Sequence, residues 1–555
     1  MNAAVPAELP GLMQDFPLSL SHILRRMRSV RGRSEIVTLR KADGPVERIT
    51  FAQAAVRIDR LAAGLRALGV GPGDRVGTFA WNTQEHFEAY FAVPCLGAVL
   101  HTANPRLSPP QIVYTINHAA DRVLIVDSSL LGAIAEIASQ LSSVEHFVVI
   151  GDGDISALPK AIRYEDLLAG HDPLPEWPEP DERAAAALCY TSGTTGNPKG
   201  VLYSHRSIAV HTLLMCAHDT YRLSARDRVL AVVPMFHAMG WNLPYVAGLL
   251  GADIVMPGAH LKPAQLVRLI EEERITSTSG VPTVWQDVLR YADEHASDLS
   301  SLEYVICGGA RVPPILIRGF KQRHGVAVVQ GWGMTEIFPG AAIGHEPHDA
   351  GTDDRVKIEA MAGRVSPFYE IRIVSDDGTV QPSDGVSAGE IQVRGPAVAS
   401  GYYNNPEADT EAFDPGWLRT GDIGTIDGSG WLRLTDRAKD VIKSGGEWIS
   451  SIDLESALLE HPAVLEVAVI AAPDPRWTER PLACIVASEH VQPSELDGFL
   501  ATRVATWWIP DNYAFVSQLP RTSVGKVNKK ALREMHAAGE LSMSRTPTSD
   551  ISGGF

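Results

Sequence analysis

The sequence predicts an α/β fold, with a large N-terminal domain of helix-covered sheets plus a β subdomain, and a small mobile α+β C-terminal domain. A chain of 555 residues exceeds what one hydrophobic core supports, so it should divide into domains. Short apolar runs alternate with helical patterns over much of its length, which indicates a parallel sheet covered by helices. Beyond Gly363 the strands are instead joined by short turns such as 427–430 (DGSG), which is typical of antiparallel hairpins.

The first predicted helix follows Thr50, which has capping-box spacing to Gln53. Apolar residues then recur near the helical period until Gly69 ends the helix. The next predicted elements are a strand at 75–80, a helix at 87–96 and strands at 98–102, 122–127 and 147–150.

A segment rich in Pro, Glu and Asp at 171–181 should connect this region to a strand at 184–190. Further buried strands are predicted at 228–233, 252–256, 277–280 and 304–307, each ending in a loop with Pro or Gly. Ligands of open α/β sheets bind at the carboxyl ends of the strands, so these loops are where we expect the site.

The hairpin strands of the β subdomain are predicted at 370–374, 390–394, 423–426 and 431–434. After Arg437 we expect a helix at 451–459, strands at 463–471 and 483–488, and a helix at 493–505. The expected domains are therefore 1–436 for the N-terminal domain and 437–541 for the C-terminal domain, and 542–555 are expected to form a flexible tail.

Composition excludes several classes of protein. A net charge of -17 argues against a nucleic-acid groove, which needs a basic surface. The five cysteines are scattered and lack C-x-x-C spacing, so neither a disulfide framework nor a zinc site is predicted. No signal-peptide pattern and no run of about 20 apolar residues is present, so we expect a cytoplasmic protein without an integral membrane segment. The oligomeric state, a homodimer included, stays open.

The loop Tyr190–Gly200 (YTSGTTGNPKG) is the strongest candidate for a phosphate site. Glycines let backbone N–H groups approach a polyanion, hydroxyls donate hydrogen bonds and a lysine adds a positive charge. The order differs from that of a Walker P-loop, and a surface loop rich in Gly, Ser and Thr is the alternative. The candidate phosphate-binding residues are Thr191, Ser192, Gly193, Thr194, Thr195 and Lys199.

A second candidate block, 330–336 (QGWGMTE), places an aromatic ring between glycines and ends in a hydroxyl and a carboxylate. The ring could lie on a purine, and Thr335 and Glu336 could reach phosphate and a bridging Mg²⁺ ion. A buried tryptophan in a turn is the alternative. Asp422 could accept hydrogen bonds from ribose, with Arg437 as its companion. The other residues of this set are Gly331, Trp332, Gly333 and Met334.

In this order, these blocks resemble the adenylate-forming superfamily, which includes acyl-CoA synthetases, adenylation domains of peptide synthetases and firefly luciferase. The resemblance runs from about residue 49 to about residue 532 and is most specific at 190–200, 331–336, 417–424, 436–450 and 520–530. It implies that a carboxylic acid reacts with ATP to give an acyl adenylate and pyrophosphate, and that a thiol, usually of CoA, then displaces AMP.

The resemblance also implies roles in the first half-reaction. The loop 191–199 would hold the β- and γ-phosphates, Thr335 would contact the α-phosphate, and Glu336 with Thr191 would bind Mg²⁺. Trp332 would stack on adenine, while Asp422 and Arg437 would bind ribose. Lys526 would bridge the acyl carboxylate and the α-phosphate and neutralise charge as pyrophosphate leaves.

For the acid, the resemblance implies a pocket at 234–241 (PMFHAMGW) with an opposite wall from the 308–309 and 330 region. His237 would line the carboxylate or thiol path, and Trp241 matches the gate of long-chain enzymes. A hydrogen-bonded structural histidine is the alternative for His237. The predicted acyl-pocket residues are His237, Trp241, Gly308, Gly309 and Gln330. Ile337 departs from the Thr or Ser of many relatives.

For the second half-reaction, Lys439 would be the hinge of a domain rotation that withdraws Lys526 and brings 443–448 (KSGGEW) to the thiol tunnel. This block resembles fatty-acid CoA ligases closely, and its small residues suit passage of a pantetheine arm. The predicted CoA and hinge residues are Lys439, Lys443, Ser444, Gly445, Gly446 and Trp448.

We therefore expect an ATP- and Mg²⁺-dependent ligase that joins CoA to a small-molecule carboxylic acid, most plainly a medium- or long-chain fatty acid. Two alternatives stay open. One is a ligase for a short, aromatic or sulfur-containing acid, and the other is a nucleotide-binding protein without catalysis. Intact Lys199, Glu336 and Lys526 argue against the second alternative.

Overall fold

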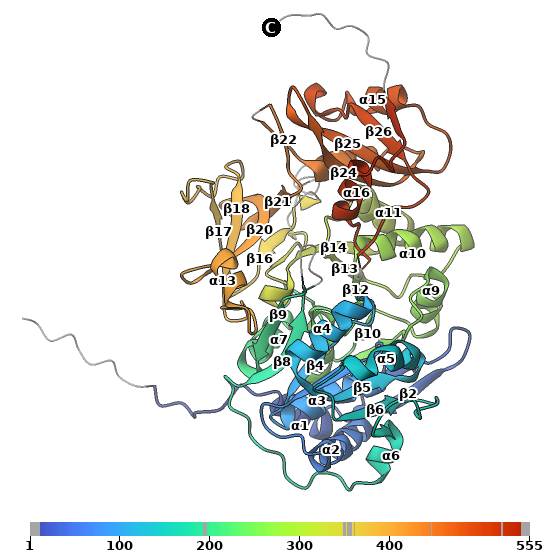
Figure 1. Ribbon diagram of the computed structural model, residues 1–555, viewed down its shortest axis with the longest axis vertical. Helices are drawn as coiled ribbons and strands as arrows, with labels where there is room; N and C mark the ends of the chain where they lie inside the picture. The colour runs from blue at the N-terminus through green and yellow to red at the C-terminus, as the bar shows by residue number, and fades with distance from the viewer. Residues whose placement is uncertain are drawn as a thin grey trace, which may run out of the picture.

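The structure is a computed structural model that describes residues 11–191, 197–347, 351, 358–359, 361–445, 447–522 and 525–545 (Figure 1). It has a large N-terminal part with two main sheets and a smaller α+β C-terminal domain, so the predicted fold class is confirmed. Within the described residues, no helix has both the length and the apolar run to cross a bilayer.

The first sheet has the order β7-β6-β5-β3-β4-β8-β9, in which all neighbours are parallel except β8 and β9. The helix α2 (Phe51–Ala67) covers it, and its predicted capping box is present: Thr50 Oγ1 accepts from the Gln53 backbone. The strands are β3 (Arg75–Phe79), β4 (Val99–Thr102), β5 (Asp121–Asp127), β6 (His146–Ile150), β7 (Ala161–Arg163), β8 (Ala185–Tyr190) and β9 (Gly200–Ser204). The other helices of this region are α3 (Gln84–Cys95), α4 (Pro109–Ala119), α5 (Leu131–Ile137) and α6 (Tyr164–Ala169).

The second sheet is continuous from the α/β part into the β subdomain, in the order β17-β18-β20-β21-β16-β15-β14-β13-β12-β10-β11-β1-β2. The neighbours from β14 through β1 are parallel, and those from β17 to β14 are antiparallel. The parallel part contains β1 (Glu35–Leu39), β10 (Arg228–Leu230), β11 (Asp253–Met256), β12 (Ser277–Gly280), β13 (Tyr304–Gly308) and β14 (Ala327–Trp332), with β2 (Val46–Thr50) antiparallel at the edge. The remaining strands are β15 (Ala342–Ile343), β16 (Gly363–Val365), β17 (Glu370–Val374), β18 (Gly389–Arg394), β20 (Trp417–Ile426) and β21 (Trp431–Arg437), with β19 (Phe413–Asp414) on β20.

One strand of this sheet is shorter than predicted. The run 228–233 is strand only as far as Leu230, because Asn82 Nδ2 donates to the carbonyls of Ala231 and Val233 at 2.7 and 2.8 Å. Asn82 Oδ1 also accepts from the Met235 backbone N–H at 2.7 Å. The side chain thus replaces a neighbouring strand and bends the chain toward the site.

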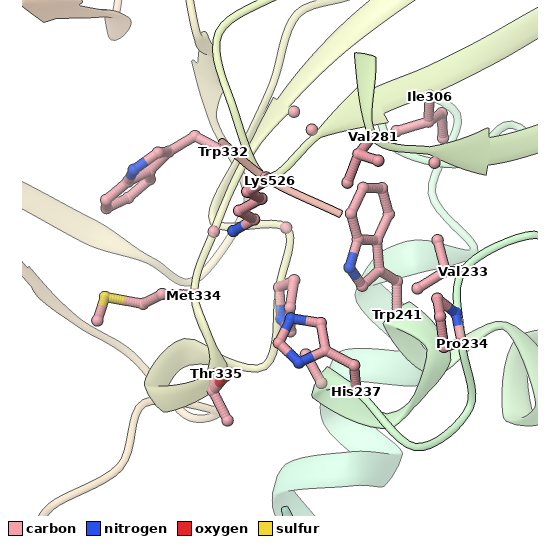
Figure 2. Close-up of a pocket in the computed structure, with 18 of the residues that line it drawn as sticks. Val233, Pro234, His237, Trp241, Val281, Ile306, Trp332, Met334, Thr335 and Lys526 are labelled. Carbon is pink, nitrogen blue, oxygen red and sulfur yellow. The ribbon is translucent and has the colours of Figure 1, made fainter. Parts of the chain in front are cut away.

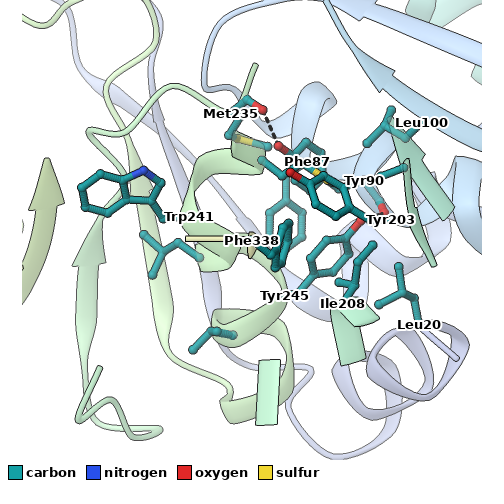
Figure 3. Close-up of a cluster of buried hydrophobic side chains, with 14 of the residues drawn as sticks. Leu20, Phe87, Tyr90, Leu100, Tyr203, Ile208, Met235, Trp241, Tyr245 and Phe338 are labelled. Atoms are coloured by element: carbon teal, nitrogen blue, oxygen red, sulfur yellow. Dashed lines mark hydrogen bonds between the residues drawn. The ribbon is translucent and has the colours of Figure 1, made fainter. Parts of the chain in front are cut away.

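The remaining helices of the large part are α1 (Ser21–Ser29), α7 (His205–Met215), α8 (Leu243–Leu250), α9 (Pro263–Glu272), α10 (Pro282–His295) and α11 (Pro314–His324). A buried aromatic and aliphatic cluster joins α3, α7 and α8 behind the site (Figure 3). In it the hydroxyl of Tyr90 donates to the carbonyl of Met235, and Tyr245 Oη donates to the Tyr90 carbonyl at 2.9 Å. The loop after β10, which contains Met235, is therefore anchored to the hydrophobic core by a buried hydrogen bond.

The C-terminal domain has a sheet in the order β23-β22-β25-β26-β27, with β24 on β25. Its strands are β22 (Ile442–Ser444), β23 (Glu447–Ile449), β24 (Val464–Asp474), β25 (Thr478–Ala487), β26 (Asn512–Phe515) and β27 (Met543–Arg545), and its helices are α14 (Ser451–Leu458), α15 (Pro493–Leu500) and α16 (Lys529–Ala537). Two predictions were wrong here. The helix predicted at 493–505 ends at Leu500, because 501–503 are exposed and offer no apolar face to bury. Residues 543–545, assigned to the tail, pair with the edge strand β26.

Ion pairs join the two domains beside α11. Arg311 pairs with Asp453 of α14, and Arg318 Nη2 lies 3.0 Å from Glu460 Oε1. Arg433 of β21 also faces Asp453, at 3.6 Å. These contacts hold the small domain over the ends of β13 and β14.

Candidate active site

A cavity of about 280 Å³ lies where the strand ends of the second sheet meet the small domain (Figure 2). Its walls come from Thr191 after β8, the loop after β10, the ends of β12, β13 and β14, and Lys526 of the small domain. Half of the predicted site residues line it together: Thr191, His237, Trp241, Gly308, Gly309, Gly331, Trp332, Gly333, Met334, Thr335, Glu336, Arg437 and Lys526.

Thr335 and Glu336 form a short 3₁₀ turn, Thr335–Ile337, directly after β14. Both side chains are buried, and burial raises the pKa of the Glu336 carboxyl although a hydrogen bond from Tyr402 opposes it. Tyr402 Oη donates to Glu336 Oε1 at 2.7 Å. The carboxylate therefore faces the cavity with a fixed rotation.

Trp332, Asp422 and Arg437 come together from three strands. Trp332 Nε1 donates to Asp422 Oδ2 at 2.8 Å, and Arg437 Nε lies 3.4 Å from Asp422 Oδ1. Asp422 and Arg437 are direct partners in the β20–β21 ladder, which explains why their side chains lie close together. The structure thus brings together the residues that we predicted for adenine and ribose.

The two ends of the predicted phosphate loop pair with each other. The Thr191 N–H donates to the Lys199 carbonyl at 2.9 Å, and the Lys199 N–H donates to Thr191 Oγ1 at 3.1 Å. Lys199 Nζ lies 4.8 Å from the centre of the Tyr402 ring. The predicted residues Ser192, Gly193, Thr194 and Thr195 lie outside the described residues.

Lys526 reaches into the cavity from the loop before α16 (Figure 2). Burial and the charge of Arg437 lower the pKa of Lys526 to about 8, against the opposing effect of the charges of Asp422 and Glu336. Lys526 shares the cavity with Glu336, Arg437 and His237. Its ammonium form is the one able to stabilise developing negative charge there.

His237 and Trp241 lie on the opposite wall (Figure 2). Burial, with the charges of Lys526 and Arg106, lowers the pKa of His237 to about 3, so its imidazole is neutral. The tip of Trp241 covers Gly308: its Cη2 atom would lie 3.2 Å from a Cβ atom added to that glycine. This geometry agrees with a wall that a larger residue at 308 would obstruct.

The turn that carries Trp241 has an unusual backbone. Residues 238–242 all have positive φ, from 36° at Ala238 to 64° at Asn242, although only Gly240 tolerates this freely. Such strain persists where the surroundings fix it. Asn242 Nδ2 donates to His211 Nδ1 at 2.9 Å and Thr212 Oγ1 at 3.0 Å, and Tyr221 Oη donates to the Trp241 carbonyl at 2.8 Å.

Gln330 does not line the cavity, which corrects its prediction as an acyl-pocket residue. Its Oε1 atom accepts from the Val312 N–H at 2.9 Å, and its Nε2 atom donates to the Met361 carbonyl at 2.9 Å. Both ends of the amide are therefore used to hold the backbone behind β13 and β14.

The predicted CoA and hinge residues are also not among the described lining residues of the cavity. Lys443 and Ser444 lie in β22, Gly445 has φ +61°, and Lys443 Nζ is 6.0 Å from the ring centre of Trp448. Burial and the charge of Arg437 lower the pKa of Lys439, which lies two residues after the end of β21. Gly446 lies outside the described residues.

Several lining or supporting residues escaped prediction. Arg106 enters from the loop after β4, with its guanidinium carbon 5.6 Å from the Phe236 ring centre. Tyr221, Val281 and Val284 add to the acid side. Tyr402 was also missed, although it stands in a Gly-Tyr-Tyr block that could have signalled an aromatic loop beside the site.

The donor set at Glu336 suits Mg²⁺. A carboxylate and the Thr191 hydroxyl are hard oxygen ligands, which this ion prefers. Within the described residues no group of three or more His, Cys, Asp or Glu side chains could hold a metal alone.

Comparisons with known proteins agree on one family. Residues 27–403 match the family described as AMP-binding enzyme, and residues 453–526 match the AMP-binding enzyme C-terminal domain. The chain is 46% identical over 534 residues to a long-chain-fatty-acid–CoA ligase of Thermus thermophilus, covering 95% of this chain and 97% of that protein. It is 42% identical to a 3-methylmercaptopropionyl-CoA ligase of Ruegeria lacuscaerulensis (94% and 98% covered) and to a medium-chain-fatty-acid–CoA ligase of Ectopseudomonas oleovorans (95% and 97% covered).

Solved structures are similar over the whole fold. An anthranilate CoA ligase in complex with anthranoyl-AMP superposes with a TM-score of 0.85 at 28% identity, covering 95% of this chain and 99% of that chain. ATP-bound MatB from Rhodopseudomonas palustris superposes with a TM-score of 0.81 at 26% identity, covering 94% and 99%.

Proposed function

The chain belongs to the AMP-binding enzyme family, and we propose that the acid it activates is a medium- or long-chain fatty acid. As relatives at 42–46% identity over nearly the whole chain are acyl-CoA ligases, it is an acid–thiol ligase that uses ATP and CoA. The identity of the acid and the need for Mg²⁺ belong to the proposal.

The observation that carries the proposal is the apolar acid side of the cavity. It is lined by Trp241 and by the aliphatic side chains Val232, Val233, Leu261, Val281, Val284, Ile306 and Ile343. Each methylene of an acyl chain buried there would gain about 0.8 kcal/mol. An acid whose main feature is a hydrocarbon chain therefore fits this wall.

In the proposed first half-reaction the acid carboxylate attacks the α-phosphorus of ATP, giving acyl-AMP and pyrophosphate. Lys526, as an ammonium, lies where it can neutralise charge on the carboxylate and the α-phosphate. Glu336 and Thr191 would hold Mg²⁺, which neutralises the phosphates when bound. Neutral His237 lines the acid path as a dipole and adds no charge.

In the proposed second half-reaction the CoA thiol displaces AMP after the small domain rotates at Lys439. The proposed domains are 1–436 and 437–541, with β27 now showing that 543–545 pack on the small domain. Support comes from the present arrangement, in which Lys526 lines the cavity and the described residues 443–445 and 447–448 do not. One site would then serve the two steps in turn.

Two observations favour testing other acids beside fatty acids. One relative at 42% identity is a 3-methylmercaptopropionyl-CoA ligase, and another, at 34%, is a feruloyl-CoA synthase from Amycolatopsis.

The cytoplasmic setting also stays a proposal, supported by the five cysteines, which are all free thiols.

A panel of acids tests the proposal. We would measure AMP release with CoA for saturated acids from butanoate to palmitate, beside 3-methylmercaptopropionate and ferulate. The expected result is a kcat/KM that rises roughly fourfold per added methylene until the pocket is filled. A higher kcat/KM for the sulfur-containing or aromatic acid would overturn it, and ATP binding without any acid-dependent pyrophosphate exchange would indicate a binding protein.

A further inference from the structure

The segment 399–403 touches both parts of the phosphate site. The Ala399 N–H donates to the Glu336 carbonyl at 2.7 Å, and the Tyr403 N–H donates to the Gly200 carbonyl at 2.8 Å. Gly200 directly follows Lys199, so one short segment holds the turn with the carboxylate and the end of the phosphate loop. These two parts are more than 130 residues apart in the chain, from Gly200 to Glu336.

The side chain of Tyr402 repeats this bridge. Its hydroxyl donates to Glu336 Oε1 at 2.7 Å, and its ring centre lies 4.8 Å from Lys199 Nζ. Among the described residues, Lys199 and Glu336 form no direct ion pair. The ring thus gives the cation a neutral partner, and the hydroxyl gives the anion one, so each charged group is held without a direct bond to the other.

Tyr402 is itself held in place. Its N–H donates to Asp409 Oδ1 at 2.6 Å, and its ring packs edge-on against Phe413 with 5.6 Å between centres. Asp409 lies in α13 (Pro406–Ala412), which packs on β20 of the β subdomain. The bridge therefore rests on a folded element, which keeps its length constant.

We propose that Tyr402 is a positioning residue that sets the orientation of Glu336 and Lys199 so that Mg²⁺ and the β- and γ-phosphates of ATP bind as one unit. This inference rests on the proposed roles of Glu336 and Lys199. It assigns separate tasks to the two parts of one side chain. The hydroxyl orients the carboxylate for the metal, and the ring holds the ammonium group for the phosphates.

Two variants separate these tasks. Tyr402→Phe removes the hydroxyl and keeps the ring, whereas Tyr402→Leu removes both. ATP binding to the full-length enzyme without acid would be measured by calorimetry over a series of Mg²⁺ concentrations. We expect Tyr402→Phe to need about tenfold more Mg²⁺ for half-maximal affinity while keeping its ATP affinity at saturating Mg²⁺, because a hydrogen bond to a charged group is lost. Tyr402→Leu should in addition lose roughly threefold in ATP affinity at saturating Mg²⁺.

The controls use a neighbouring residue and a shorter ligand. Tyr403→Phe keeps the backbone bond to Gly200 and the ring contact with His118, so it should behave as wild type. AMP lacks the β- and γ-phosphates, so its affinity should not change in any variant. An unchanged Mg²⁺ requirement in Tyr402→Phe would overturn the inference, and so would an equal loss of AMP and ATP affinity. Failure of the wild-type enzyme to bind Mg²⁺ with ATP would instead contradict the proposed metal site.

Discussion

The Cε atom of Lys526 lies 3.1 Å from the point that a Cβ atom would occupy on Gly309, with Lys526 Nζ at 3.4 Å from the same point. The two residues come from different domains, so the absence of a side chain at 309 lets the small domain bring its lysine into the cavity. The close fit between them reports on whether the domains are closed, and it leads to the first prediction.

Gly309→Ala should impair the first half-reaction and spare the second. The new methyl group would displace Lys526, and a displacement of about 1 Å can cost about a hundredfold in rate. We expect acid-dependent pyrophosphate exchange to fall by about that factor, with thioester formation from supplied acyl-AMP within about twofold of wild type. Lys526→Ala should show the same pattern.

Gly325→Ala is the matched control, because Gly325 has a similar φ of +72° but no atom within 4 Å of its added Cβ. It reproduces the backbone strain without the contact. Equal losses of pyrophosphate exchange in the two alanine variants would assign the effect to backbone strain. That result would contradict the claim that a side chain at position 309 displaces Lys526.

The pH dependence of adenylation should follow Lys526. Because burial lowers its pKa to about 8, the ammonium form is present below that pH and is lost as pH rises through it. We expect kcat/KM for ATP in pyrophosphate exchange to fall about tenfold per pH unit above about pH 8. Lys526→Arg should move this fall to higher pH, since arginine stays protonated. The exposed Lys530→Arg should leave the profile unchanged, and a fall that persists in Lys526→Arg would contradict the assignment.

Fixing the proposed hinge should have the opposite effect on the half-reactions. Lys439→Pro locks φ near -65° and would hinder rotation of the small domain. We expect adenylation to be retained and thioester formation from supplied acyl-AMP to fall at least about tenfold. Lys439→Ala removes the side chain without locking the backbone and should retain both steps. Loss of adenylation in the proline variant alone would place the hinge elsewhere.

Removing the indole that covers Gly308 should change the choice of acid. Trp241→Ala would open the space beside Gly308, so the acid with the highest kcat/KM should be a longer one than in the wild type. Each methylene newly buried there should raise kcat/KM roughly fourfold. The measurement is AMP release across the saturated acids. Trp507→Ala removes a tryptophan that is 44% exposed in the small domain and should leave the profile unchanged. If the preferred chain length were unchanged in Trp241→Ala, the assignment of Trp241 to the acyl pocket would be wrong.

Sequence patterns predicted buried strands accurately where Gly or Pro ended them. The strand β12 (Ser277–Gly280) matches its prediction to the residue, because Gly280 and the following Val281-Pro282 leave little choice of boundary. Strand β10 was predicted too long, since its end depends on Asn82, almost 150 residues earlier. Local pattern cannot identify such a partner.

The same distinction holds for the site. Motif residues such as Thr335, Glu336 and Lys526 meet in one cavity as predicted, because each motif carries its own chemistry. Gln330 also has a polar side chain, but its amide is already hydrogen-bonded to two backbone groups. Tyr402 acts through contacts with two distant segments, and neither contact is visible in the residues that surround it in the sequence.

The left-handed turn at residues 238–242 has a consequence for engineering this enzyme. Its four non-glycine residues each adopt a conformation that costs an L-amino acid about 1–2 kcal/mol, a large amount beside the typical stability of a domain, about 5–15 kcal/mol. Replacing Ala238 or Met239 by glycine would relieve that strain and raise thermal tolerance. It would also make the turn that carries Trp241 more flexible, so a gain in thermal stability at this turn would be accompanied by a loss of discrimination between acids.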